Sequence, residues 1–303
     1  MKQLYRVLPV ALSVGLFGCG NTNTTTQQST TAQESTTPVA PKVIETEEEP
    51  VSKLPDTAPV VTVASDPDYA PYVFKNEYGN MTGFEIELVR SIGEDQGFKV
   101  ENYNHKWEFI YDVLDTKKRD MIAAGIPYSS ENASKYLISD PYAPLPPTVV
   151  YLDDSLNIKS LNDLSNVKIG TTVNTIEYDL FSSGDFAVKS VDSYDTIFQA
   201  VQALAQGKVD AVAGDSGVLR YTLNDLPELK PIFFDYRELN EPASRIGYVI
   251  DKDQPELLAK VNAGLKNLKE NGTYATLTTK WFGKDLTADV LEQEKILEAA
   301  SAP

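Results

Sequence analysis

From Val60 onward, short runs of apolar residues alternate with longer segments whose apolar residues recur at helical spacing. The first run, VVTVAS at residues 60–65, is rich in β-branched residues and predicts a strand. Residues 83–92, GFEIELVRSI, place their aliphatic side chains on one face of a helix. Residues 98–101 predict the next strand. The pattern therefore indicates a folded region that begins close to Val60.

The alternation of strand and helix continues to about Phe282. We expect buried strands at residues 120–124, 167–170 and 209–213, and a helix at residues 194–205. Strands that are separated by helices along the chain favour parallel α/β sheets. Periodicity does not decide between one sheet and two.

The N-terminal segment has a different character. Lys2 and Arg6 precede an apolar run at residues 7–17 that is too short to span a bilayer comfortably, and the run is followed by Cys19. This arrangement resembles the lipobox of bacterial lipoproteins. The resemblance implies that residues 1–18 are a lipoprotein signal peptide and that the thiol of Cys19 is lipidated. The alternative is an ordinary signal peptide with an incidental cysteine.

Residues 19–57 predict a flexible tether. They are rich in Thr, Gln, Pro and Glu and lack aromatic residues, so they cannot bury enough apolar surface to fold. Such a segment would hold the folded region away from a membrane and leave it free to rotate.

Composition narrows the classes of function. The chain has 303 residues, 42% hydrophobic and 23% charged, which is enough for about two globular domains. Its formal net charge of −17 repels phosphate backbones, so we expect no nucleic-acid partner. One cysteine and one histidine are too few for a Cys/His zinc site, a disulfide or a Cys–His catalytic pair. We therefore expect no metal site and no cofactor.

Five segments stand out by their order and spacing. They are Ser65–Tyr72 with Gly79 and Thr82–Leu88; Trp107 with Leu114 and Arg119–Asp120; Ile138–Tyr142; Gly207–Val212 with Asp215; and Asn271–Tyr274 with Lys280–Phe282. Together they resemble the polar amino-acid family of type 2 periplasmic solute-binding proteins of ABC transporters. The resemblance implies an α/β, two-lobed type 2 periplasmic binding protein fold with two hinge crossings, in which the lobes close around the ligand.

The resemblance also implies the division of the chain. Lobe 1 would take residues 58–146 and 238–285, lobe 2 residues 147–237, and residues 286–303 would form an amphipathic C-terminal tail that docks on a lobe. Three prolines within residues 143–147 independently favour an extended first crossing, and residues 241–244 are a plausible return.

The resemblance assigns ligand contacts to particular residues. Tyr69 and Trp107 match the two aromatic positions that sandwich the ligand side chain, although either ring could simply belong to the core. Asp66, at the end of a predicted strand, matches a residue that meets the polar end of the ligand. Asp215 matches the carboxylate that receives an α-ammonium, and could also cap the following helix. Thr175 matches a threonine that faces the ligand carboxylate.

The segment after residues 120–124 departs from the family pattern. Where the family has an arginine that clamps the ligand carboxylate, this chain has Asn132, which supplies no charge. Ordinary amino acids should then bind poorly. Tyr72 and Tyr128 are weaker candidates for ligand contacts.

Three alternatives remain open for the missing charge. The amides of a helix that begins near Ser129 could attract an anion. Lys135, Arg237 or Arg245 could replace the arginine. Finally, the ligand could be a cation without a carboxylate, held by aromatic rings and acidic side chains.

A second class of function uses the same fold, since a few secreted dehydratases that act on cyclic precursors of phenylalanine share it. Glu131, Glu177 or Asp66 could supply the required acid if burial raised its pKa. The lone histidine, His105, is more typical of a surface residue. A sensor would need a membrane-spanning signalling segment, and none follows the predicted domain.

The sequence thus predicts a monomeric, extracytoplasmic receptor that is anchored to the cell-envelope membrane through lipidated Cys19, in the periplasm if the host is Gram-negative. It would capture a small polar, amine-bearing solute, an amino acid or an amino-acid-like compound, and present it to an ABC permease without covalent chemistry. The expected ligand-binding residues are Asp66, Tyr69, Trp107, Tyr128, Ser129, Asn132, Thr175 and Asp215.

Overall fold

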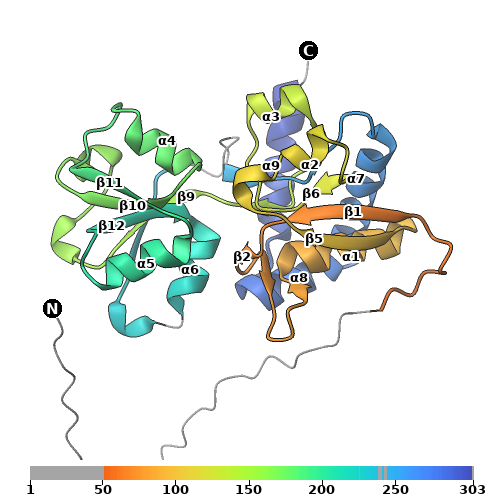
Figure 1. The fold of residues 1–303 in the computed structure, drawn as a ribbon, viewed down its shortest axis with the longest axis horizontal. Helices are drawn as coiled ribbons and strands as arrows, with labels where there is room; N and C mark the ends of the chain where they lie inside the picture. Colours follow the sequence, from red (N-terminus) through yellow and green to blue (C-terminus); the bar gives the residue numbers. More distant parts are fainter. Residues whose placement is uncertain (1–50, 225, 238–240, 242–243, 302–303) are drawn as a thin grey trace, which may run out of the picture. The chain divides into compact units, whose positions relative to one another are not determined.

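The computed structural model of the protein describes residues 51–224, 226–237, 241 and 244–301 (Figure 1). The predicted signal peptide, the lipidation site Cys19 and most of the tether lie outside the described residues. The last residues of the expected tether contact lobe 1, since the backbone N–H of Lys53 donates to the carboxylate of Glu94 at 3.1 Å. Within the described ranges, no helix is both long enough and apolar enough to cross a membrane.

The first five-stranded sheet has the order β5-β1-β6-β15-β7. Its strands are β5 (Lys99–Asn104), β1 (Val60–Ser65), β6 (Met121–Ile122), β15 (Val249–Ile250) and β7 (Leu137–Ile138). Strand β1 is parallel to β5 and β6, whereas β15 is antiparallel to β6 and β7. The expected parallel pairing is confirmed for β1 with β5 and β6, but the sheet is mixed because β15 enters it from the opposite direction. We call the part built around this sheet lobe 1.

Helices and a small sheet complete lobe 1. They are α1 (Phe84–Gln96), α2 (Asp112–Asp115), α3 (Ser130–Lys135), α7 (Pro255–Glu270), α8 (Thr273–Phe282), the 3₁₀ helix η1 (Trp107–Phe109), and a three-stranded sheet of β2 (Asp68–Tyr69), β3 (Val73–Lys75) and β4 (Met81–Thr82). The expected apolar face of α1 is confirmed, since Ile86, Val89 and Ile92 are fully buried.

The second five-stranded sheet has the order β11-β10-β12-β9-β13, and we call the part built around it lobe 2. Its strands are β11 (Ser190–Tyr194), β10 (Lys168–Thr172), β12 (Ala211–Asp215), β9 (Pro147–Tyr151) and β13 (Ile232–Asp235). Strand β9 is antiparallel to β12 and β13, so this sheet is mixed as well. Its helices are α4 (Ile176–Ser182), α5 (Ile197–Ala205), α6 (Ser216–Asn224) and the 3₁₀ helices η2 (Asp154–Leu156), η3 (Leu161–Leu164) and η4 (Pro227–Leu229).

The predicted start of the helix at residues 194–205 is three residues too early. Helix α5 starts at Ile197, because the side chain of Thr196 caps it by accepting a hydrogen bond from the backbone N–H of Gln199. Tyr194 instead ends β11, a strand that the sequence did not predict. Strand β11 lies at the edge of the sheet and is mostly polar, SVDSY, so it lacks the apolar run that marks a buried strand.

In the described part of the chain, an extended segment leads from lobe 1 to lobe 2. Strand β8 (Ala143–Pro144) pairs antiparallel with β14 (Arg245–Ile246), and the chain passes from β8 directly into β9 of lobe 2 (Figure 1). The proline-rich first crossing is therefore extended, as the sequence predicts. Residues 242 and 243 of the expected return at residues 241–244 lie outside the described residues.

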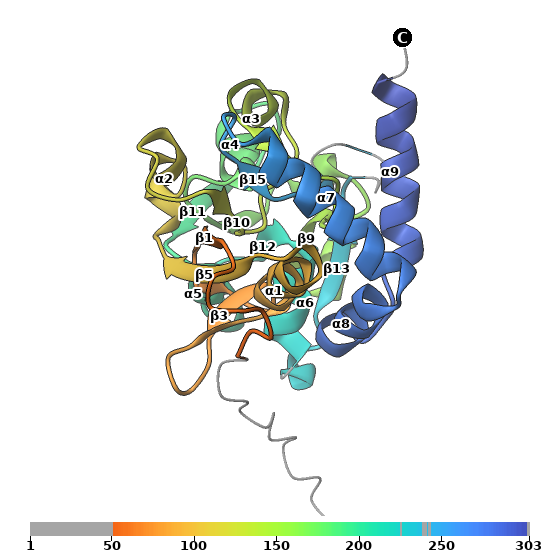
Figure 2. The same cartoon turned by 90° about the vertical axis from the view of Figure 1, so that its right-hand side faces the viewer.

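Helix α9 (Thr287–Ser301) packs against lobe 1 beside α7 (Figure 2), where Lys269 forms an ion pair with Glu294. Val290 is fully buried in the core of lobe 1. The neighbouring Leu291 is 41% exposed, whereas Gln293 is buried and donates to the backbone oxygen of Ser244 at 3.2 Å.

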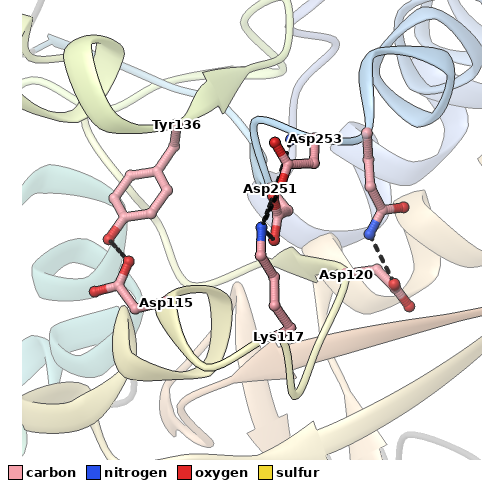
Figure 3. Close-up of polar contacts among 7 residues, drawn as sticks. Asp115, Lys117, Asp120, Tyr136, Asp251 and Asp253 are labelled. Atoms are coloured by element: carbon pink, nitrogen blue, oxygen red, sulfur yellow. Dashed lines mark hydrogen bonds and ion pairs between the residues drawn. The ribbon is translucent and has the colours of Figure 1, made fainter.

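Polar contacts fix the turns next to β6 (Figure 3). Lys117 lies between the carboxylates of Asp251 and Asp253 at 2.6 and 2.7 Å. Gln254 donates to Asp120 at 2.8 Å. These contacts tie the segment before β6 to the segment after β15. They hold in place the strand whose carboxyl end leads into the site described next.

Candidate functional site

A cleft of about 410 Å³ lies between the two lobes. Lobe 1 contributes the segments that follow β1, β5 and β6, and lobe 2 contributes the segments that follow β10, β11 and β12. Each wall is therefore made at the carboxyl ends of strands, where open α/β sheets place their binding sites.

The structure places all eight predicted ligand-binding residues on the wall of this cleft. Lobe 1 provides Asp66, Tyr69, Trp107, Tyr128, Ser129 and Asn132, and lobe 2 provides Thr175 and Asp215. Tyr72, a weaker candidate, is instead buried in the core and lines a second cavity behind the cleft.

Two aromatic residues of lobe 1 reach across the cleft to lobe 2. The hydroxyl of Tyr69 donates to Oδ2 of Asp215. The indole Nε1 of Trp107 donates to the backbone oxygen of Asn174 at 3.0 Å. Each ring thus adds a flat face to the cleft and a hydrogen bond between the lobes.

The ring of Tyr69 is held from both sides. It stacks on Tyr72, with ring centroids 5.3 Å apart and an interplanar angle of 28°. It also lies against Gly125, whose φ is +62° and where an added Cβ would come within 2.2 Å of the tyrosine ring. A larger residue at Gly125 would displace Tyr69 from the cleft.

Asp66 has a positioning role in addition to facing the cleft. Its Oδ2 accepts from the backbone N–H of Trp107 at 2.6 Å, and its Oδ1 accepts from that of Asp68 at 3.0 Å. Burial raises the pKa of the Asp66 carboxyl, and these two backbone hydrogen bonds oppose the rise. Asp66 therefore fixes the start of η1 and with it the position of Trp107.

Thr175 caps helix α4. Its hydroxyl donates to the backbone oxygen of Thr172 at 2.9 Å and accepts from the backbone N–H of Tyr178 at 3.2 Å. The residue before it, Asn174, has φ of +58°, a conformation that asparagine tolerates better than most residues. The hydroxyl of Thr175 is thus already engaged within the helix cap.

Asn132 lies in the first turn of α3, which begins after Ser129. Ser129 Oγ accepts from the backbone N–H of Asn132 at 3.0 Å, and the side-chain Nδ2 of Asn132 donates to the hydroxyl of Tyr111 at 3.0 Å. Tyr111 stacks on Tyr136, whose hydroxyl donates to Asp115 at 2.8 Å (Figure 3). The side-chain amide of Asn132 is therefore tied to a pair of stacked tyrosines.

Tyr111 lines the cleft but was not predicted from sequence. One feature of the sequence could have indicated it: Tyr111 follows Trp107 by four residues. In the helical segment formed by η1 and α2, this spacing places both rings on one side. Without a matching family position, that spacing did not distinguish Tyr111 from a core residue.

None of the three basic residues considered as a replacement for the arginine lines the cleft. Lys135 pairs with Glu131 at 2.8 Å on the surface. Arg237 lies 3.7 Å from Glu241 and lines the second cavity. Arg245 is buried with its guanidinium 5.2 Å from the ring centre of Tyr128. In the part of the chain that the structure describes, the cleft wall holds no lysine, arginine or histidine.

The same wall is rich in carboxylates. They are Asp66, Asp68, Glu131, Glu177, Asp179, Asp195 and Asp215. Burial raises the pKa of Asp215 well above its ordinary value, and the nearby charge of Glu177 adds to the rise, whereas the hydrogen bond from Tyr69 opposes it. The described wall of the cleft therefore has seven acidic side chains, and burial makes Asp215 harder to ionise.

A further carboxyl lies beneath the cleft. Glu85 of α1 is fully buried, and its Oε1 accepts from the backbone N–H of Gly125 at 2.8 Å. Burial raises the pKa of Glu85 to about 7, against the lowering effect of Tyr142 and of the Gly125 N–H. Glu85 supports the turn on which Tyr69 rests.

His105 does not line the cleft and accepts a hydrogen bond from Nε of Arg119 at 3.3 Å. Burial, followed by the charges of Arg119 and Lys118, lowers the pKa of His105. Among the described residues, no group of three or more His, Cys, Asp or Glu side chains is arranged to hold a metal ion.

Comparison with known proteins identifies related chains. A family model for bacterial extracellular solute-binding proteins, family 3, matches residues 61–284. The L-cystine-binding protein TcyA of Bacillus subtilis (strain 168) is 28% identical over 230 residues, 75% of this chain and 83% of the relative. The ABC transporter arginine-binding protein 1 of Escherichia coli (strain K12) is 25% identical over 214 residues, 71% of this chain and 87% of the relative.

Solved structures agree with these relatives. An ancestral arginine-binding protein bound to arginine has a TM-score of 0.66 and 29% identity, covering 74% of this chain and 98% of its own. The ancestral amino acid-binding protein AncCDT-1, a precursor of cyclohexadienyl dehydratase, has a TM-score of 0.65 and 32% sequence identity. The match covers 74% of this chain and 95% of that protein. The two-lobed type 2 fold expected from the sequence is confirmed.

Proposed function

Since the chain belongs to the bacterial extracellular solute-binding proteins of family 3, we propose that the solute it binds for import is a small organic cation with an amine or guanidine group and no carboxylate. The protein acts outside the cytoplasm as the substrate-binding component of an ABC transporter.

One observation carries this proposal: the described wall of the cleft has seven carboxylates and no basic side chain. An amino-acid carboxylate in such a cleft would lose its hydration without gaining a cationic partner, at a cost of several kcal/mol. Asn132 offers an amide in place of a charge, and that amide already donates to Tyr111. A cation, by contrast, is stabilised by the carboxylates of the same wall.

The short helix α3 does not replace the missing charge. Its cap, Ser129, already accepts the backbone N–H of Asn132, which removes one of the free amides that could meet an anion. Glu131 in the first turn also places a negative group at this helix start. An anion at this helix start would find fewer free backbone N–H groups and would lie close to the carboxylate of Glu131.

Binding would work through closure of the lobes. A cation that contacts Tyr69 and Trp107 on lobe 1 and Asp215 on lobe 2 favours the state in which the lobes lie together. The two hydrogen bonds that already cross the cleft, from Tyr69 and Trp107, belong to that state. No covalent step is part of this cycle.

The cellular setting completes the proposal. Lipidation of Cys19 would anchor the protein to the envelope membrane, and the tether would let the monomeric receptor reach its permease. Labelling cells with a radioactive or clickable fatty acid tests the anchor. The Cys19→Ser variant should lose the label and be released from the membrane fraction.

A thermal-shift screen tests the ligand class. The panel contains diamines, agmatine, quaternary ammonium compounds, amino acids and dicarboxylates, because a ligand that binds only the folded state raises its apparent stability. Amines and agmatine should raise the midpoint most. A panel in which only zwitterionic amino acids or dicarboxylates stabilise the protein would contradict the proposal.

A second candidate is a dehydratase that acts on a prephenate-like ring, as considered from the sequence. One observation favours it: Glu177 lines the cleft, and burial raises the pKa of its carboxyl, which is what a general acid needs. The same cleft disfavours it, since such a substrate carries carboxylates and finds no basic side chain on the described wall. Incubation with prephenate and detection of an aromatic product distinguishes the two.

A further inference from the structure

Tyr72 lies outside the ligand cleft but contacts the opposite lobe. Only 2% of its surface is exposed, and its ring lies against Gly217 in the first turn of α6. A Cβ atom on Gly217 would lie 2.3 Å from the hydroxyl oxygen of Tyr72, 2.9 Å from Cε2 and 3.0 Å from Cζ. Non-bonded heavy atoms are most stable at separations of about 3.5 Å or more. With the lobes in this arrangement, only glycine therefore fits at this point between them.

The ring of Tyr72 cannot easily withdraw from Gly217 within lobe 1. Tyr69 stacks on it with ring centroids 5.3 Å apart, and the ring centroid of Phe282 lies 5.2 Å away. Phe84 makes an edge contact, with centroids 6.3 Å apart and an interplanar angle of 77°. Since protein cores are closely packed, a displaced ring would have to displace these neighbours as well. A side chain at residue 217 is accommodated more easily by a movement of the whole lobe.

We infer that Gly217 is a positioning residue for lobe closure, because it lets α6 approach Tyr72 closely enough for the cleft to shut around the solute. The inference rests on the proposed function, in which the solute is held by closure of the two lobes. It gives Tyr72 a contact between the lobes in place of the ligand contact considered from the sequence. Neither Tyr72 nor Gly217 lines the cleft, so both act without touching the solute.

The contact at Gly217 is coupled to the hydrogen bond that crosses the cleft. Tyr72 stacks on Tyr69, whose hydroxyl donates to Asp215 at the end of β12. Gly217 follows Asp215 by two residues, so the same pair of rings meets the same corner of lobe 2 at both points. A Cβ at residue 217 requires about 1 Å of extra separation from the Tyr72 oxygen. Hydrogen bonds between oxygens are confined to a range of about 0.5 Å, so this separation breaks the bond from Tyr69.

Local helix preference alone would favour alanine at residue 217. Glycine weakens a helix because it loses more backbone entropy on folding, and alanine is the strongest helix former. The φ of Gly217 lies outside the left-handed region, so its own backbone conformation does not require glycine. The close approach of Tyr72 supplies the physical reason for glycine at this position.

Stopped-flow fluorescence of the full-length protein tests this inference. Trp107 lies on the cleft wall and donates to the backbone of Asn174 in lobe 2, so its fluorescence reports closure when agmatine or arginine is mixed with the protein. Gly217→Ala destabilises only the closed state. It should therefore raise the dissociation rate about tenfold or more and leave the association rate within about twofold of wild type. Calorimetry should give the same loss of affinity.

A substitution in the opposite lobe should restore part of the binding. Tyr72→Phe removes the hydroxyl oxygen, the atom nearest to residue 217, and should by itself change the affinity by less than about threefold. Combined with Gly217→Ala, it should recover about threefold or more of the lost affinity, so the two effects are not additive. Damage confined to α6 would not be repaired by a change in lobe 1.

Gly170→Ala is the matched control. Gly170 lies in β10, and a Cβ there would meet Val209 at 3.2 Å and Tyr194 at 3.3 Å, both in lobe 2. The same substitution therefore crowds lobe 2 without touching lobe 1, and it should leave the dissociation rate unchanged. Thermal unfolding shows that Gly217→Ala folds: the empty variant should match or exceed the midpoint of wild type, because the open state relieves the contact and alanine favours the helix.

The outcomes separate the inference from the proposed function. If wild type binds agmatine but Gly217→Ala releases it at the wild-type rate, or Tyr72→Phe recovers none of the lost affinity, the inference is wrong and the proposed function stands. If wild type binds arginine and not agmatine, the proposed function is wrong, and the dissociation rate of arginine then tests the inference. If wild type binds neither, both are wrong.

Discussion

The hydroxyl of Tyr69 in lobe 1 donates to the carboxylate of Asp215 in lobe 2, across the cleft. The same tyrosine ring stacks on Tyr72 and rests on Gly125, so the hydrogen bond starts from a ring that cannot easily turn away. This contact joins the rigid wall of one lobe to the charged group that we expect to meet the ligand.

The first prediction concerns this contact. Tyr69→Phe keeps the ring and removes the donor, so it should weaken amine binding about tenfold, which corresponds to roughly 1.4 kcal/mol. Calorimetry measures the change, and Tyr103→Phe, which removes a hydroxyl on the surface of lobe 1, is the control. Unchanged affinity in Tyr69→Phe would mean that the contact plays no part in closure around the ligand.

The second prediction concerns Asn132, where the resemblance seen in the sequence implies an arginine in the family. Asn132→Arg adds a cation to a wall that has none among the described residues. It should raise the affinity for zwitterionic amino acids at least tenfold and lower that for amines, because like charges repel in a partly dry cleft. Asn132→Gln, which adds length without charge, should do neither. Tighter amine binding by Asn132→Arg would contradict our description of the site.

Asp66 gives a third prediction. Asp66→Ala leaves the backbone N–H groups of Trp107 and Asp68 without their carboxylate acceptor, which should cost about 1–3 kcal/mol of stability and shift the fluorescence of Trp107. Ligand affinity should fall with it. Glu108 is an exposed residue of η1, the 3₁₀ helix that contains Trp107. Glu108→Ala should change neither the stability nor the fluorescence of Trp107. A stable Asp66→Ala variant with native fluorescence would show that Trp107 is positioned by other contacts.

Buried Glu85 gives a prediction for pH. Its pKa is raised from 4.5 to about 7 in the folded protein, so the folded state holds the proton more tightly than the unfolded state. The free energy of unfolding should therefore decrease as pH rises from about 4.5 to about 7, by about 3 kcal/mol from this group. Glu85→Gln cannot ionise, so it should lose this part of the pH dependence.

Urea unfolding of wild type and Glu85→Gln at about pH 5 and about pH 8 measures the effect. The variant should gain stability relative to wild type at the higher pH. Asp95→Asn, on the exposed side of the same helix, should keep the pH profile of wild type. A constant difference between Glu85→Gln and wild type at both pH values would contradict the raised pKa.

The eight residues predicted from motifs lie together at one cleft because residues at strand ends occupy fixed positions in this fold. Asp66 follows β1 and Asp215 ends β12, so the order of elements alone brings both to the cleft. The sequence could not reveal what each side chain already binds. The engagement of Thr175 in a helix cap and of Asn132 with Tyr111 depends on contacts between segments that only the folded chain brings together.

The orientation of the strands was less predictable. Strand β15 returns to lobe 1 after the chain has crossed lobe 2, so its direction depends on the path of the whole chain and not on local periodicity. Edge strand β11 was missed because its polar residues carry no burial signal. Glu177 was considered only as an acid, since a glutamate in the first turn of a helix is ordinarily exposed.

The central claim is that the cleft selects for positive charge and against a carboxylate. Arginine and agmatine differ by that carboxylate alone, so their affinities for the full-length protein, measured by calorimetry in the same buffer, test the claim most directly. The account predicts that agmatine binds at least tenfold more tightly than arginine. Equal affinities, or tighter binding of arginine, would contradict it.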